Sequence, residues 1–253
     1  MDKEGRMKSF GLFEGLIKAP PNIYKDFRAF TLGHALLKVS KDWNSRKAKA
    51  TLKKIAQQFH VKIPTKQVRD NHYKWPNPHL DLPPQYQHDE MDDDPDYLRL
   101  KVTNEASSLR ADYDPENWMV TIYLATYVDE VLGLVDDESD LQVEVTKMCH
   151  IIETDVKHEL MHYVQDISLQ YKHAKQNKGQ VGNKKKDYFL APQEFDPTIR
   201  SEIGEFQARV KRPYSPSKIK EFTSQSEFFK VLKQHDPKRY KIAMKKFGTE
   251  IGK

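Results

Sequence analysis

The stretch His158-Glu159-Leu160-Met161-His162 constrains this chain more than any other, because it fixes three chemically active side chains on one local structure. It lies in a segment from about residue 140 to about residue 171 that has helical periodicity and contains no proline. Residues four apart lie on the same face of a helix, so His158 and His162 can direct their imidazoles at one point. The segment therefore predicts a long helix with a metal-binding face.

Two neutral imidazoles at this spacing suit Zn²⁺, and they leave a tetrahedral ion two ligands short. Catalytic zinc sites fill one position with a third protein ligand and leave the other for water. Glu159 points about 100° away from His158 on the helix, so it reaches the rim of the site and not the same ion. There it can take a proton from the water and deliver it to a leaving amine. A structural zinc site does not need this carboxylate, so the motif predicts a hydrolytic centre with one Zn²⁺ per chain.

The residues around the motif leave the third ligand open. The longer form of the motif ends with a histidine six residues past His162, but Ser168 stands there, and Gln165 replaces its glycine. An acidic ligand from further along the chain is the alternative. The candidates are Glu194, Glu202 and Glu205. Asp166 lies on the same face as His162, where it either accepts a hydrogen bond from a ligand or faces solvent.

A later segment carries a resemblance to a known group of proteins. The motif is followed by Tyr188-Phe189-Leu190-Ala191-Pro192-Gln193-Glu194-Phe195-Asp196. Together they resemble the small gluzincin-type metallopeptidase-like proteins often encoded by tailed phages, over about residues 150–210. The resemblance implies that His158, His162 and Glu194 are the zinc ligands and that Glu159 is the general base. The chain departs from the pattern after Asp196, where Pro197 and Ile199 stand in place of small residues.

Three strand-like stretches precede the metal-binding helix. Residues 97–102 alternate apolar and basic side chains, and residues 118–124 give the strongest strand signal in the chain. Residues 108–113 are a further candidate, followed by a turn at Asp114-Pro115-Glu116-Asn117. These stretches predict a small, mostly antiparallel sheet directly before the helix. The expected fold class is α+β and zincin-like, with helical N- and C-terminal extensions.

Composition divides the chain into three expected regions. Residues 1–96 are a helical N-terminal region that ends in a proline-rich acidic arm over residues 64–96. Residues 97–211 form the metallopeptidase core, including a further helix that starts at Asp196-Pro197, with Asp as N-cap and Pro at the first position. Residues 212–253 form a basic tail with two helical patterns.

Charge and cysteine content set the expected surroundings. The net charge of +5 permits an acidic partner without requiring one. Cys149 is the only cysteine, which rules out an intramolecular disulfide and favours a reducing compartment. Its apolar neighbours predict a packing role. No apolar run approaches the roughly 18 residues of a membrane span. We therefore expect a soluble cytoplasmic protein with no membrane partner, or a virion-associated one if the chain is phage-encoded.

The lysine-rich stretch 172–186 bears on which partner the chain is expected to bind. Its six lysines and two glycines predict a mobile loop beside the cleft. Residues 173–187 include no Phe, Tyr or Trp that could stack on bases, so nucleic acid is not an expected partner. A protein or peptide substrate is expected instead. The competing hypothesis is a non-catalytic structural or virion-associated binding protein held by a zinc staple, which would be free to lose Glu159. The oligomeric state is left open.

Overall fold

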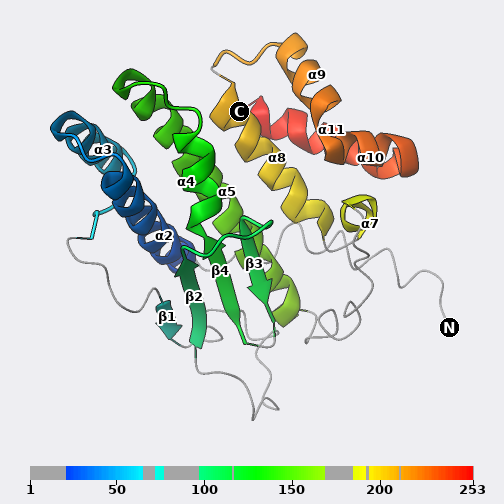
Figure 1. Cartoon of the computed structure of the whole chain (residues 1–253). Coiled ribbons are helices and arrows are strands. Elements are labelled where there is room, and N and C mark those ends of the chain that lie inside the picture. Colours follow the sequence, from blue (N-terminus) through cyan, green and yellow to red (C-terminus); the bar gives the residue numbers. More distant parts are fainter. Residues whose placement is uncertain are drawn as a thin grey trace.

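Figure 1 shows the computed structural model of the chain, which describes residues 21–64, 72–76, 97–115, 117–168, 185–191, 194–210 and 212–252. The fold is mixed α and β, with many helices and one small sheet. Helix α5, Glu138–Ser168, lies centrally between the sheet and the C-terminal helices. It confirms the long helix predicted from about residue 140. The predicted last residues of that helix and most of the stretch 172–186 lie outside the described residues.

The described strands form one mixed sheet in the order β1-β2-β4-β3. Their bounds are His72–Pro76 for β1, Tyr97–Thr103 for β2, Ala111–Asp114 for β3 and Met119–Tyr123 for β4. The β1–β2 and β3–β4 pairs are antiparallel, as predicted for most of the sheet, whereas β2 and β4 run parallel. β1 lies in the arm over residues 64–96, whose composition predicts irregular structure.

The order of the strands follows from their side chains. β4 takes a central place because Val120 and Ile122 are fully buried. β3 carries Asp112 and Asp114 and lies at an edge, where charged side chains can remain partly exposed. The chain therefore passes from β2 to the edge and returns through β4, which makes β2 and β4 parallel. β3 starts at Ala111, later than the predicted stretch of residues 108–113.

Helices α2 (Pro21–Asp42), α3 (Arg46–Gln58) and α4 (Leu124–Leu132) share one hydrophobic core with α5 and the sheet. Ser45 caps α3, because its Oγ accepts a hydrogen bond of 2.9 Å from the backbone N–H of Ala48. Cys149 is fully buried in this core, which confirms its predicted packing role. Burial also raises the pKa of its thiol. The N-terminal helices thus support α5 directly.

The C-terminal half builds a second hydrophobic cluster. Its helices are α7 (Lys185–Leu190), α8 (Phe195–Arg209), α9 (Pro216–Gln225), α10 (Glu227–His235) and α11 (Pro237–Ile251). α8 packs against α5 on one side and against α11 on the other. It therefore connects the second cluster to the helix that carries the motif. Among the helices that the structure describes, none has both the length and the apolar character needed to cross a membrane.

The start of α8 differs from the prediction. The Asp196-Pro197 pair predicts a helix that begins at residue 197, but α8 begins at Phe195 and its N-cap residue is Glu194. The Glu194 side chain makes no capping hydrogen bond. The carboxylate of Asp196 accepts a hydrogen bond of 2.7 Å from Lys246 on α11, so it does not cap the helix either. Neither acidic side chain caps α8, because Glu194 lies against the two histidines of α5 and Asp196 is bonded to Lys246 of α11.

Candidate metal centre

Three side chains meet where the N-terminal end of α8 approaches α5. Nε2 of His158 lies 3.0 Å from Nε2 of His162. Oε2 of Glu194 lies 3.5 Å and 3.4 Å from these two nitrogens. In the part of the chain that the structure describes, these residues form the group of metal-ligating side chains with one donor atom each within 4.8 Å of the others. The structure thus brings together the two histidines of the motif and one of its three candidate acidic partners.

The two imidazoles are held from behind by polar side chains. Nδ1 of His158 lies 2.9 Å from Oγ of Ser201 on α8, and Nδ1 of His162 lies 3.2 Å from Oε1 of Gln165. A histidine that ligates a metal through Nε2 commonly uses its other nitrogen in this way, which fixes the ring and its tautomer. Both Nε2 atoms consequently face the carboxylate of Glu194.

The spacing of the donor atoms can be compared with that expected of a tetrahedral zinc site. A tetrahedral Zn²⁺ with ligand bonds of about 2.0–2.1 Å places its ligand atoms about 3.3–3.4 Å apart. The three separations in the structure, 3.0, 3.4 and 3.5 Å, lie around that value. Oε2 of Glu194 is also buried and makes no hydrogen bond of acceptable geometry. A buried oxygen of this kind is costly unless a cation satisfies it. The residues present therefore fit a divalent ion.

Electrostatics within the group follow from its burial. Burial lowers the pKa of His162, but the neighbouring Glu194 carboxylate outweighs it and raises that pKa to about 9. Burial raises the pKa of Glu194, but the two imidazoles outweigh it and hold that pKa well below its usual range. Glu194 is thus a charged carboxylate although it is only 7% exposed. Such a buried anion needs a cation beside it.

Glu159 lies at the edge of the same group and is 8% exposed. Burial raises the pKa of its carboxyl group, and Asp112 and Asp155 raise it further, against the opposing effect of the two histidines. Asp112 belongs to the edge strand β3, and its own pKa is lowered by His162 but raised overall by burial and by Asp114. The strand therefore runs close to the candidate site.

Asp155 stands one helical turn before Glu159 on α5. Its carboxylate accepts a hydrogen bond of 2.7 Å from the hydroxyl of Tyr127. Burial raises the pKa of Asp155, and the Tyr127 hydrogen bond and the charge of Arg110 reduce this rise without cancelling it. This hydrogen bond holds Asp155 beside Glu159, and Asp155 is not part of the donor group.

The other two glutamates that the sequence offers as metal ligands lie outside the donor group. Glu205 forms an ion pair with Arg209 on the same helix. Glu202 is bonded to Ser226 between α9 and α10, and burial raises its pKa to about 7. Neither belongs to the donor group with His158 and His162. The backbone of Asp166 is helical, but its side chain lies outside what the structure describes.

Three contacts at the site have no counterpart in the sequence analysis. Ser201 and Gln165 support the histidines, and the hydroxyl of Tyr188 lies 3.4 Å from Nε2 of His158. Gln165 stands three residues after His162, so helical spacing could have indicated it. No local pattern could have indicated Ser201, because its position depends on the packing of α8 against α5.

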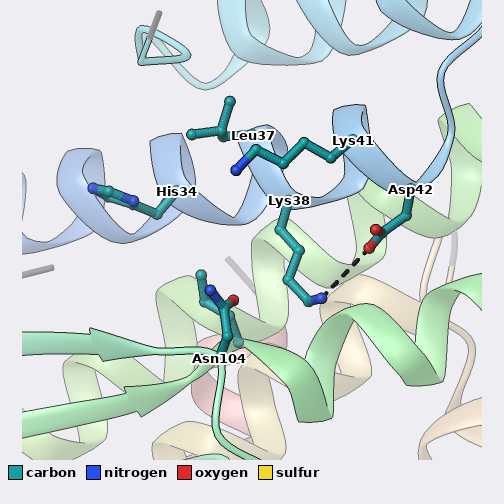
Figure 2. Close-up of a pocket in the computed structure, with 7 residues that line it drawn as sticks. His34, Leu37, Lys38, Lys41, Asp42 and Asn104 are labelled. Atoms are coloured by element: carbon teal, nitrogen blue, oxygen red, sulfur yellow. Dashed lines mark hydrogen bonds and ion pairs between the residues drawn. The ribbon is translucent and has the colours of Figure 1, made fainter. Parts of the chain in front are cut away.

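A separate pocket of about 110 Å³ lies beside α2, near the ends of β2 and β4 (Figure 2). Its lining residues are His34, Leu37, Lys38, Lys41, Asp42, Asn104 and Leu124. Lys38 and Asp42 form an ion pair of 3.5 Å along the wall of this pocket. None of the lining residues belongs to the donor group, so the pocket is distinct from the candidate metal centre.

Comparisons of this chain with protein-family models, with curated proteins and with solved structures find no match. The resemblance to gluzincin-type metallopeptidase-like proteins therefore stays a prediction, which rests on residues His158–His162 and Tyr188–Asp196. The class of the site is defined by its geometry alone: two histidines and one carboxylate able to hold a metal ion.

Proposed function

We propose that this chain is a metal-dependent peptidase that holds one Zn²⁺ between His158, His162 and Glu194. The observation that carries the proposal is the position of Glu159, a buried carboxylate next to three clustered donor atoms. A bound Zn²⁺ would act as a Lewis acid that lowers the pKa of a water to about 7 and polarises a carbonyl group. A His₂Glu donor set is one that catalytic zinc sites use.

The chain's own residues supply the proton transfers. Glu159 accepts a proton from the attacking water and later donates it to the amine that leaves the peptide bond. A base of this kind works best when its pKa is moved towards neutrality. The burial of Glu159 and the nearby charges of Asp112 and Asp155 act in that direction. A site built only to staple the fold would gain nothing from this buried acid.

The position of β3 supports a peptide as the substrate. Among the described strands, β3 pairs with β4 alone and lies at the edge of the sheet. An extended peptide can pair with such an edge through main-chain hydrogen bonds. Asp112 on this strand interacts electrostatically with both His162 and Glu159, so a peptide paired there would pass close to the general base.

The test combines elemental analysis with hydrolysis of a labelled, unfolded protein substrate. Wild-type protein purified with zinc should hold about one Zn²⁺ per chain. Glu159→Gln should keep the metal and lose hydrolysis by at least about 100-fold, because general acid–base catalysis contributes roughly 10²–10⁴-fold. Glu205→Gln is the matched control and should remain active, since Glu205 pairs with Arg209 outside the donor group.

Three results would change the proposal. Zinc-replete wild-type protein without bound zinc would remove the metal site. Full activity in a metal-bound Glu159→Gln variant would remove the assigned base. Bound zinc with no hydrolysis of any unfolded protein substrate would favour the competing hypothesis, a non-catalytic zinc-stapled binding protein.

A further inference from the structure

The hydroxyl of Tyr188 lies at the same donor group as the histidines and Glu194. Its oxygen is 3.4 Å from Nε2 of His158, and the carboxylate of Glu194 is close enough to interact with it electrostatically. Tyr188 belongs to the short helix α7, which immediately precedes the segment that carries Glu194. A phenol oxygen can serve as a metal ligand, as it does for iron in some haem proteins.

The distances among the donor atoms indicate that the phenol oxygen of Tyr188 lies at a fourth ligand position. The separations among the three proposed ligand atoms are 3.0, 3.4 and 3.5 Å, and the phenol oxygen adds 3.4 Å to His158. Three of the four values are close to the edge of about 3.3–3.4 Å expected of a tetrahedral zinc site, and the separation between the two histidine nitrogens is shorter. From these separations we infer that Tyr188 is a fourth ligand, which closes the site in this conformation. This inference rests on the proposed metal binding and adds a residue to it.

The second hydrophobic cluster holds Tyr188 in place. The next residue, Phe189, packs its ring 5.7 Å from that of Phe228 on α10. The carbonyl oxygen of Leu190 accepts a hydrogen bond of 2.9 Å from the guanidinium of Arg239 on α11. That guanidinium also lies over the ring of Phe195, 5.6 Å from its centre. The end of α7 and the start of α8, which lie on either side of Glu194 in the sequence, are therefore both anchored by the C-terminal helices.

This arrangement has a consequence for the proposed reaction. The corner that Tyr188 takes is the one that a catalytic site leaves for water and substrate. Tyr188 must therefore leave the donor group before a peptide is hydrolysed, while His158, His162 and Glu194 remain. The packing of α7 against α10 and its hydrogen bond to Arg239 of α11 then set how readily the site opens.

Copper binding provides a readout that does not depend on activity. Metal-free protein would receive one equivalent of Cu²⁺, and the visible spectrum would be examined for a phenolate-to-copper charge-transfer band. Wild type should show the band, and Tyr188→Phe should lose it while still binding copper. Tyr240→Phe is the matched control, since Tyr240 contacts Phe229 in the second cluster, and it should keep the band. His162→Ala should also lose the band, which would assign it to this site.

Zinc affinity gives a second measurement. Competitive titration with a chelator should show that Tyr188→Phe binds Zn²⁺ about tenfold more weakly than wild type, a small loss for a ligand because water can take the vacated fourth position. Copper bound with His162-dependent stoichiometry but without the band would refute the fourth ligand and leave the proposed metal site intact. A wild-type chain that binds neither copper nor zinc would refute both. Circular dichroism of each variant would confirm that the helices are retained.

Discussion

Oε2 of Glu194 lies 3.4 Å from Nε2 of His162, although one residue is the N-cap of α8 and the other stands near the end of α5. Nothing local in the chain produces this approach. It depends on α8 lying along α5, with its first residues at the histidines. The proposed metal site is therefore as sensitive to helix packing as to the identity of its ligands.

The choice of third ligand predicts a ranking of two glutamates. Glu194→Ala should weaken Zn²⁺ binding by more than about 100-fold, because it removes a ligand and not a supporting group. Glu202→Ala should have little effect on affinity, since Glu202 is bonded to Ser226 outside the donor group. Competitive chelator titration measures both. A larger loss in Glu202→Ala would move the third ligand into α8.

The hydrogen bond behind His158 predicts a smaller effect. Ser201→Ala should lower zinc affinity by about 10–100-fold, because Nδ1 of His158 loses its partner at 2.9 Å and the ring loses its fixed orientation. Ser201→Thr retains a hydroxyl and should recover most of the affinity. Ser217→Ala, on the exposed start of α9, is the control and should bind zinc as wild type does. Equal affinities in all of these variants would contradict the supporting role.

The close approach of α8 to α5 predicts a steric effect at Gly204. A Cβ at this position would lie 2.8 Å from Cγ2 and 3.0 Å from Cβ of Thr154. Gly204→Ala should therefore reduce the free energy of unfolding by about 1–3 kcal/mol, as measured by urea denaturation. It should also weaken zinc binding, because α8 must move away from the histidines.

A double variant separates this clash from a general effect on the helix. Thr154→Ala removes the side-chain atoms that oppose the new methyl group, so Gly204→Ala with Thr154→Ala should be more stable than the sum of the single effects predicts. Strictly additive changes in the free energy of unfolding would show that the new methyl group at position 204 does not clash with the side chain of Thr154.

The buried carboxyl group of Glu202 predicts a dependence of stability on pH. Burial raises the pKa of Glu202 in the folded chain from 4.5 to about 7, against the Ser226 hydrogen bond. The folded state therefore binds this proton more tightly than the unfolded state does. The protonated carboxyl group makes its full contribution to the free energy of unfolding below the unfolded pKa, and that contribution is lost as pH rises through the folded pKa. Glu202→Gln should consequently be more stable than wild type by about 1–3 kcal/mol at about pH 8.

The same variant should lose its advantage in acid. At about pH 4, below the unfolded pKa of 4.5, Glu202 is mostly protonated in both the folded and the unfolded chain and resembles glutamine, so the two unfolding free energies should converge. Urea denaturation of both proteins across this range measures the difference. A constant difference between wild type and Glu202→Gln at every pH would show that the carboxyl group does not titrate differently on folding.

The sequence alone predicts the elements that depend on local periodicity. The spacing of His158 and His162 places them on one helical face, and α5 confirms the helix. The buried strand β4 and the packing of Cys149 follow equally from runs of apolar residues. The two helical patterns predicted for the tail are divided at Asp236-Pro237, where Asp236 accepts a capping hydrogen bond from the N–H of Arg239 at the start of α11. The first pattern forms two helices and not one, because Ser226 ends α9 and caps α10.

Other features depended on contacts between segments far apart in the chain. Local signals place the start of the last core helix at Asp196-Pro197, but Lys246 binds Asp196, and Glu194 becomes the N-cap residue. The parallel pairing of β2 with β4 and the strand β1 are likewise non-local, because strand partners are chosen by burial across the whole sheet.

The donor group contains both kinds of feature, those that follow from the local sequence and those that depend on helix packing. The helix repeat alone makes two ligands neighbours, since residues four apart share a face at any position along α5. Glu194, Glu202 and Glu205 were equivalent by residue type, and only the resemblance to gluzincin-type proteins implied Glu194. In the structure, the packing of α8 against α5 places Glu194 beside the imidazoles. Ser201 and Tyr188 reached the site in the same way. A sequence records local geometry in its periodicity, whereas contacts between helices depend on the shape of both packed faces, which no single stretch contains.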